Sequence, residues 1–217
     1  MAILKSKKII LAIISILLFI IIVVCLLTNN IYQFDLAVFD LLLKHSNAFF
    51  DITLRNITKA GSFIYLVGFC ILLILYFRKE TWKYLLALNL FNITALSQIL
   101  KYIFARERPD PLLRDGYSFP SAHTMLAMAF FGFLIYIINA KTTWSKGIKI
   151  IISSLLGLLI LLVGISRVYL GYHFASDVIA GILIAFAYLL LFTYVISNTS
   201  TIQNISKHIK QLLKTKP

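Results

Sequence analysis

A histidine and an aspartate interrupt two apolar runs near the end of this chain. In the stretch SRVYLGYHFASDV, His173 and Asp177 are four residues apart, so their side chains face each other on one helical turn. Arg167 precedes them, and the residues on both sides of the stretch are almost all apolar. Ionisable groups in such surroundings usually have a function or a partner, which makes this stretch a candidate site.

Two earlier segments carry similar chemistry. In KYIFARERP, Lys101 and Arg108 are seven residues apart, about two helical turns, so both can present cations on one face. Pro109 disfavours helix continuation at Arg108. The segment PSAH, residues 120–123, directly precedes another apolar run, so its amides are expected at a helix N-terminus, where anions bind. His123 stands beside those amides.

Taken singly, these features are weak, because a basic residue at the end of an apolar helix is usually an anchor in the lipid interface. Together they amount to three cations, two histidines, one carboxylate and a helix N-terminus. Cations and amides gathered in this way fit a phosphate group.

The composition indicates the elements that position these residues. Hydrophobic residues make up 60% of the 217, only 13% are charged, and the mean hydropathy is +0.92, as in an integral membrane protein. We expect an all-α bundle of six transmembrane helices, forming one membrane-embedded domain over residues 1–217. The expected spans are residues 9–27, 60–77, 84–100, 124–140, 150–165 and 178–196.

The net charge of +13 would suggest a nucleic-acid partner in a soluble protein, but its distribution argues for membrane topology. If the N-terminus is cytoplasmic, 13 of the 21 basic residues fall on the cytoplasmic side: Lys5, Lys7, Lys8, Arg78, Lys79, Lys83, Lys141, Lys146, Lys149, Lys207, Lys210, Lys214 and Lys216. This bias predicts a multi-pass protein of the cell membrane with both termini in the cytoplasm. The three polar segments then meet on the outer face, and no nucleic-acid partner is expected.

The connection between the first two spans, residues 30–59, contains a helical pattern. Ile31, Phe34 and Val38 recur at helical spacing, with Asp35 and Asp40 between them. We therefore expect an amphipathic helix in the outer interface, either packed there or acting as a lid or guide for a lipid substrate.

The three segments together resemble the motifs of the type 2 phosphatidate phosphatase family. Residues 101–109 resemble its Lys-x6-Arg-Pro motif, residues 120–123 its Pro-Ser-Gly-His motif, and residues 166–177 its Ser-Arg-x5-His-x3-Asp motif. The order and spacing also agree. Ala122 departs from the pattern, because glycine is usual there; alanine would be disfavoured if that backbone needs a positive φ.

The resemblance implies roles for these residues. His173 is the nucleophile that forms a phosphohistidine, Asp177 fixes its tautomer, and His123 protonates the leaving group. The expected phosphate-binding residues are Lys101, Arg108, Ser121, Ala122 and Arg167. No metal and no cofactor are expected, because cations and a helix N-terminus supply the charge.

The resemblance also implies a phosphorylated lipid as substrate. Because the predicted site faces outward, undecaprenyl pyrophosphate is the first expectation, and phosphatidylglycerophosphate or phosphatidate the second. A lipid phosphotransferase is the nearest alternative enzyme. A transporter would carry its polar residues near the centres of the spans, and a non-catalytic lipid-binding protein would not need the intact histidine pair. The sequence does not indicate an oligomeric state.

Overall fold

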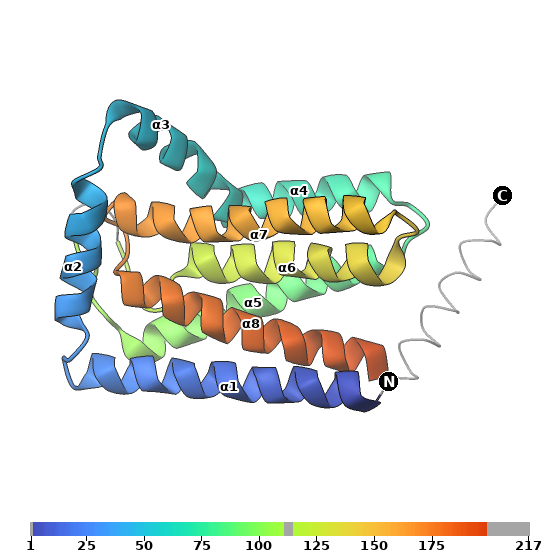
Figure 1. Ribbon diagram of the computed structural model, residues 1–217, viewed down its shortest axis with the longest axis horizontal. Coiled ribbons are helices and arrows are strands. Elements are labelled where there is room, and N and C mark those ends of the chain that lie inside the picture. Colours follow the sequence, from blue (N-terminus) through green and yellow to red (C-terminus); the bar gives the residue numbers. More distant parts are fainter. Residues whose placement is uncertain (1, 111–114, 199–217) are drawn as a thin grey trace.

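The computed structural model describes residues 2–110 and 115–198, and the regular structure among them is entirely helical. The helices are α1 (Ala2–Leu27), α2 (Tyr32–Leu43), α3 (Ala48–Ile57), the 3-10 turn η1 (Thr58–Gly61), α4 (Phe63–Tyr76), α5 (Trp82–Phe104), α6 (Ala122–Lys141), α7 (Lys146–Tyr169) and α8 (Ala175–Asn198). The long helices lie side by side as a bundle (Figure 1).

Five helices, α1, α5, α6, α7 and α8, are long and apolar enough to cross a membrane. The second expected span, residues 60–77, is different. Its apolar part is α4, whose 14 residues rise only about 21 Å against a hydrocarbon core of roughly 30 Å. A sixth crossing requires α4 together with the segment Ala48–Gly61, and the two halves are bent by 58° at Ser62. The expected span at residues 60–77 therefore corresponds to one half of a bent pair of helices.

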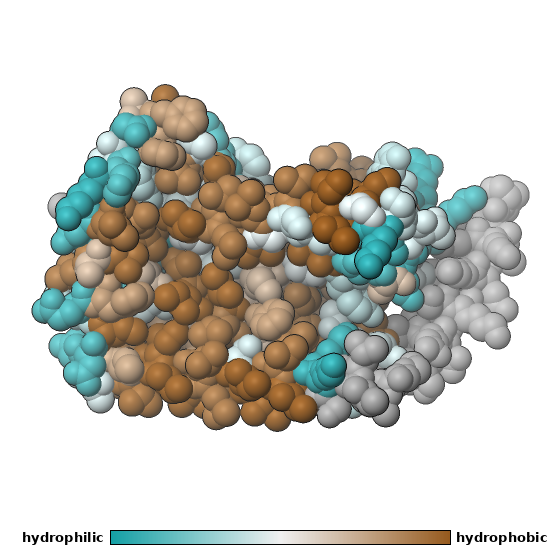
Figure 2. Space-filling view, viewed as in Figure 1, coloured by the Kyte–Doolittle hydropathy of each residue, from teal (hydrophilic) through white to brown (hydrophobic). Residues whose placement is uncertain are grey.

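The polar and apolar surfaces agree with a membrane protein. Apolar side chains cover the length of the bundle in the face shown in Figure 2, and polar ones gather at its two ends. The start of α1 and the end of α8 lie at one end, while α2 lies across the other, which we name the α2 end (Figure 1). The ends of α5 and α7 and the starts of α6 and α8 meet at the α2 end.

Helix α6 forms the centre of the bundle, packed against α5, α7 and α8. The side chains of Met125, Phe130 and Phe133 on this helix are fully buried. A polar residue of α5 packs inward: Asn89 is buried and donates from Nδ2 to the carbonyl of Ala129 in α6 at 2.9 Å. This bond satisfies a polar group inside the bundle and fixes α5 against α6.

The connection between the first two spans contains two helices, α2 and α3, separated by a turn in which Asn47 caps α3 through the N–H of Phe50. The expected pattern placed Asp35 on a polar face and Phe34 on an apolar one. The assignment of Asp35 was wrong, because Asp35 is buried with 1% of its surface exposed. Phe34 is 45% exposed, as an apolar residue that faces lipid would be. Asp35 is turned inward because α8 and an arginine supply its hydrogen-bond donors.

A glycine sets the distance between η1 and the central helices. A Cβ on Gly61 would lie 2.6 Å from Val163 in α7 and 2.9 Å from the carbonyl oxygen of His123 in α6. Only a residue without a side chain allows this approach, which brings Thr58 of η1 to the α2 end.

Part of the topology prediction rests on basic residues that lie outside the described residues. They are Arg114, Lys207, Lys210, Lys214 and Lys216.

Candidate active site

The three predicted segments meet at the α2 end of the bundle. Lys101 stands in the last turn of α5. The helix ends at Phe104, because the next residue, Ala105, adopts a left-handed conformation with φ 44°. The chain then turns back and reaches the start of α6. The ammonium group of Lys101 donates to the carbonyl oxygens of Tyr117 and, at 3.4 Å, of Ser118, so it is held over the loop between the first two motifs.

Arg108 reaches the same place from that loop. Its Nε donates to the carbonyl oxygen of Gly116 at 3.0 Å, and its Nη1 donates to that of Tyr172 at 2.8 Å. The same Nη1 lies 3.4 Å from Nε2 of His173. One guanidinium therefore joins the first and third motifs and stands beside one nitrogen of the imidazole.

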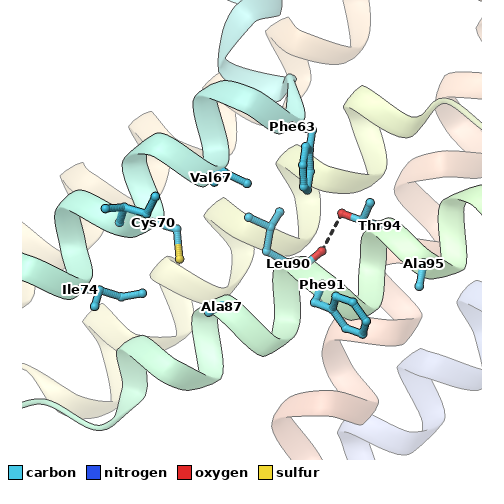
Figure 3. Close-up of a pocket in the computed structure, with 10 residues that line it drawn as sticks. Phe63, Val67, Cys70, Ile74, Ala87, Leu90, Phe91, Thr94 and Ala95 are labelled. Atoms are coloured by element: carbon cyan, nitrogen blue, oxygen red, sulfur yellow. Dashed lines mark hydrogen bonds between the residues drawn. The ribbon is translucent and has the colours of Figure 1, made fainter.

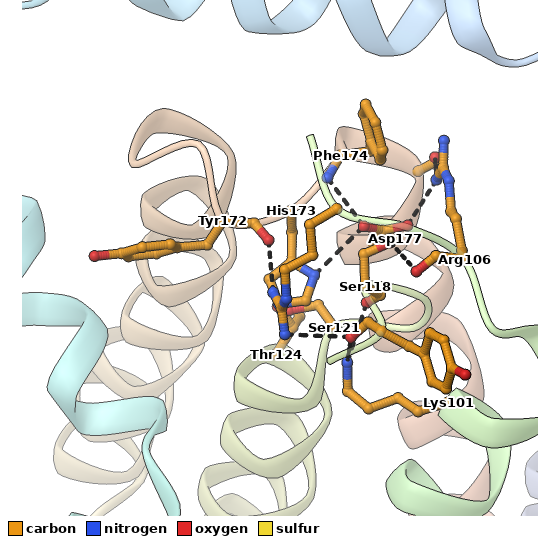
Figure 4. A network of polar contacts seen from close by, with 12 residues as sticks. Lys101, Arg106, Ser118, Ser121, Thr124, Tyr172, His173, Phe174 and Asp177 are labelled. Atoms are coloured by element: carbon orange, nitrogen blue, oxygen red, sulfur yellow. Dashed lines mark hydrogen bonds and ion pairs between the residues drawn. The ribbon is translucent and has the colours of Figure 1, made fainter. Parts of the chain in front are cut away.

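His173 and Asp177 form a pair between α7 and the first turn of α8 (Figure 4). Nδ1 of His173 lies 3.4 Å from Oδ2 of Asp177, and both side chains are almost completely buried. The N–H of Phe174 donates to the same carboxylate oxygen at 3.0 Å. With a proton on Nδ1 directed at the carboxylate, the lone pair of the imidazole is on Nε2, on the side of Arg108.

The surroundings of His173 keep its ring neutral. Burial lowers the pKa of His173 well below 6.5, and the positive charges of Arg167, Lys101 and Arg108 lower it further. A neutral imidazole at physiological pH has the free lone pair that a nucleophile or a general base needs.

A polar pocket of about 310 Å³ opens beside this pair. It is lined by Gln98, Lys101, Tyr102, Arg108, Asp115, Gly116, Tyr117, Ala122, His123 and His173. Five of the eight predicted site residues therefore line one pocket, with both histidines among them. The other three, Ser121, Arg167 and Asp177, are buried outside this lining.

The start of α6 faces the pocket through its first two residues, Ala122 and His123. The preceding Ser121 is fully buried: its N–H donates to the carbonyl oxygen of Asp177 at 3.0 Å, and its Oγ accepts from Thr124 at 3.0 Å. Ser121 thus fastens α6 to α8. Ala122 is the first residue of α6 and has no positive φ, so this position does not require glycine.

Arg167 lies deeper than expected for a phosphate ligand. Its side chain is 1% exposed, its Nη1 donates to Oγ1 of Thr58 at 2.9 Å, and its guanidinium stacks over the ring of Tyr172 at 4.5 Å. At this depth it acts on the site through its charge, which contributes to the low pKa of His173.

Sequence reasoning missed two residues of the site. Arg106 donates from Nη1 to Oδ1 of Asp177 at 2.6 Å and from Nη2 to Oδ2 of Asp35 at 2.8 Å, so it links α2 to the histidine–aspartate pair. Figure 4 shows Arg106 on the opposite side of Asp177 from His173. The burial of Asp35 depends on a partner 71 residues away, which its local pattern does not reveal.

An apolar groove of about 430 Å³ lies between α4 and α5 (Figure 3). It is lined by Phe63, Val67, Cys70, Ile71, Ile74, Ala87, Leu90, Phe91, Thr94 and Ala95. Its α5 residues continue on the same helical face into Gln98 and Lys101 of the polar pocket. From Ala87 to Lys101 this face rises about 21 Å, which exceeds the thickness of one leaflet of hydrocarbon, roughly 15 Å.

Comparison with known proteins gives consistent matches. The sequence model of the PAP2 superfamily matches residues 80–200. A phosphatidylglycerophosphatase B of Bacillus subtilis (strain 168) is 31% identical over 160 residues, which cover 71% of this chain and 79% of the relative.

Two crystal structures share the fold. The transmembrane PAP2-type phosphatidylglycerolphosphate phosphatase from Bacillus subtilis has a TM-score of 0.79 and 26% identity, over 87% of this chain and 98% of that one. Aquifex aeolicus LpxE has a TM-score of 0.54 and 26% identity, over 72% of this chain and 93% of that one.

Proposed function

The chain belongs to the PAP2 superfamily and is a membrane lipid phosphatase, and we propose that it removes the terminal phosphate of phosphatidylglycerophosphate through a phosphohistidine intermediate. The observation that carries the mechanism is the His173–Asp177 pair beside the polar pocket, with Nε2 of His173 3.4 Å from Arg108. The names of the relatives support the choice of lipid.

In the first step, Nε2 of His173 attacks the phosphorus atom while the bond from phosphorus to the lipid oxygen breaks. The proton on Nδ1 stays directed at Asp177, which stabilises the positive charge that develops on the ring. Lys101, Arg108 and the start of α6 hold the phosphoryl oxygens, and His123 donates a proton to the departing oxygen.

In the second step, water attacks the phosphorus and the bond to Nε2 breaks. His123, now neutral, accepts a proton from that water, so inorganic phosphate leaves and both histidines return to their starting states. The positive charges of Lys101, Arg108 and Arg167 supply the electrostatic stabilisation, and the proposed mechanism uses no metal.

The apolar groove supports a lipid with a hydrocarbon chain as the substrate. Because the groove and the polar pocket share one face of α5, a chain lying along Leu90 and Phe91 places its phosphate near Lys101. The tail then stays in apolar surroundings while the head group reacts.

The purified protein in detergent should release phosphate from phosphatidylglycerophosphate with a higher kcat/KM than from phosphatidate or undecaprenyl pyrophosphate. Activity should persist in excess EDTA, and vanadate should inhibit it because vanadate adopts the five-coordinate geometry of phosphoryl transfer. A strict requirement for Mg²⁺ would contradict the metal-free mechanism. The highest kcat/KM on undecaprenyl pyrophosphate would instead favour that lipid as the substrate.

Undecaprenyl pyrophosphate is supported by the charge distribution, which predicts the α2 end outside the cell and both termini in the cytoplasm. We expect a cysteine introduced by Asp115→Cys, in a background with Cys25→Ser and Cys70→Ser, to react with an impermeant thiol reagent in intact cells. Lys146→Cys, at the exposed start of α7, should react only after the cells are opened. The reverse pattern of labelling would invert the topology.

A further inference from the structure

A salt-bridge chain connects α2 to the histidine–aspartate pair. Arg106 lies between two buried carboxylates, at 2.8 Å from Oδ2 of Asp35 and 2.6 Å from Oδ1 of Asp177, with 12% of its own side chain exposed. Its guanidinium also stacks over the ring of Phe174 at 4.0 Å. Its Nη1 also donates to Oγ of Ser176 at 2.8 Å. Stacking and three charge-assisted bonds leave the guanidinium little freedom of orientation.

Asp35 is fixed from a second direction. Its Oδ1 accepts from the N–H of Ser176 at 2.8 Å, and its Oδ2 accepts from the hydroxyl of Ser176 at 2.7 Å. Ser176 is the second residue of α8, so a carboxylate from α2 satisfies an amide at the N-terminus of α8. The helix that carries Asp177 is therefore held at its start by α2.

These contacts define the orientation of the Asp177 carboxylate. Oδ1 accepts from Nη1 of Arg106, while Oδ2 accepts from the N–H of Phe174 and faces Nδ1 of His173. Without the bond to Oδ1, the carboxylate can turn about its last carbon–carbon bond, and Oδ2 then leaves the position that orients the imidazole. A misplacement of this kind affects the reaction itself, not the binding of phosphate.

We propose that Asp35 and Arg106 are positioning residues for the nucleophile: Asp35 of α2 orients Arg106, and Arg106 orients Asp177 and through it His173. Neither residue lines the polar pocket, and the bond from Arg106 to Asp177 is the contact through which they reach the pair. This inference rests on the proposed function of His173 and Asp177. It means that α2 affects the rate of the reaction through Asp35.

The test is a double-mutant cycle with Asp35→Asn and Arg106→Gln, measured as phosphate release from dioctanoyl phosphatidic acid in detergent. Asp35→Asn should lower kcat about 10-fold, and Arg106→Gln should lower it between about 10- and 100-fold. Losses of this size are typical when a residue that orients a directly acting side chain is removed. KM and the vanadate inhibition constant should stay within about twofold of wild type. Arg106→Lys should recover part of kcat, because a cation at this position can still bond to both carboxylates.

The double variant should match Arg106→Gln within about twofold, because Asp35→Asn keeps an oxygen that can accept from the N–H of Ser176 and removes chiefly the ion pair with Arg106. Asp40→Asn, the same change on an exposed position of α2, is the matched control and should retain wild-type kcat. If Asp35→Asn loses vanadate binding, its site is disturbed as a whole. The comparison of kcat between Arg106→Gln and Arg106→Lys then tests the salt bridge through its other partner. Wild-type kcat in Arg106→Gln, multiplicative losses in the double variant, or a loss confined to KM would overturn the proposal.

Failure of this proposal is distinguishable from failure of the proposed function. Asp177→Asn should lower kcat by at least about 100-fold whatever the role of α2. Wild-type activity in Asp177→Asn would contradict the function assigned to the pair itself. Loss of activity in Asp177→Asn with normal kcat in Arg106→Gln and Asp35→Asn would leave that function intact and remove only the positioning role.

Discussion

Replacing His173 with asparagine should abolish phosphate release from lipid substrates, with a fall in kcat of at least about 10⁴-fold. Asparagine retains a polar group of similar reach toward Asp177 but has no nitrogen lone pair with which to attack phosphorus. Loss of the nucleophile removes the covalent step entirely. The remaining rate acceleration then comes only from substrate binding and from the charges that hold the phosphate.

The measurement needs a readout of the bond itself. With a lipid carrying a radioactive terminal phosphate, rapid alkaline quenching should trap label on the wild-type protein, because a phosphorus–nitrogen bond survives base and is lost in acid. His173→Asn should trap none. His45→Asn is the matched control, since His45 is an exposed histidine in the turn after α2. It should retain both turnover and label, whereas near-normal turnover in His173→Asn would remove His173 from the mechanism.

The residues that sequence spacing predicted are those whose geometry is local. His173 and Asp177 are four residues apart, and their contact follows from one helical turn. Lys101 and Arg108 were expected on one helical face, two turns apart, and this reason was wrong, because α5 ends at Phe104 and Arg108 reaches the site from the loop. Their common contact with the loop at residues 115–118 also brings the first motif close to His173.

The residues that spacing did not predict depend on distant partners. Asp35 appears on the polar side of an amphipathic helix by its pattern, and only the folded chain supplies Arg106 and Ser176 as donors. Arg167 is similar: its motif position does not show that its guanidinium is buried between Thr58 and Tyr172. Burial of a charge is decided by its tertiary partners, and a single sequence does not reveal them.

The second expected span differs in length from the helix that forms there. Residues 60–77 have the composition of a membrane helix, but the uninterrupted apolar run begins only at Phe63, after Gly61 and Ser62. The run is therefore too short to cross hydrocarbon alone, and the chain bends at Ser62 instead. Measuring the run from Phe63 would have shortened the expected helix, although the 58° bend itself also depends on the packing of Gly61 against α6 and α7.

The role proposed for His123 predicts an effect that depends on the leaving group. On a lipid phosphate, the departing alkoxide is very basic and needs a proton as the bond to phosphorus breaks. His123→Gln should therefore lower kcat by about 10²- to 10⁴-fold, the usual contribution of a general acid. On p-nitrophenyl phosphate the departing nitrophenolate is a stable anion, so the first step should proceed at a rate close to that of the wild type.

The second step still needs His123, now as the base that accepts a proton from water. With p-nitrophenyl phosphate, His123→Gln should consequently form phosphohistidine quickly and hydrolyse it slowly. Stopped-flow absorbance should show a burst of about one nitrophenolate per enzyme, followed by slow turnover. His45→Gln is the matched control and should show wild-type kinetics on both substrates. Equal losses on the lipid and on p-nitrophenyl phosphate, without a burst, would show that His123 positions the phosphate and transfers no proton. A better leaving group replaces proton donation in the first step, but it replaces neither the positioning of phosphate nor the acceptance of a proton from water.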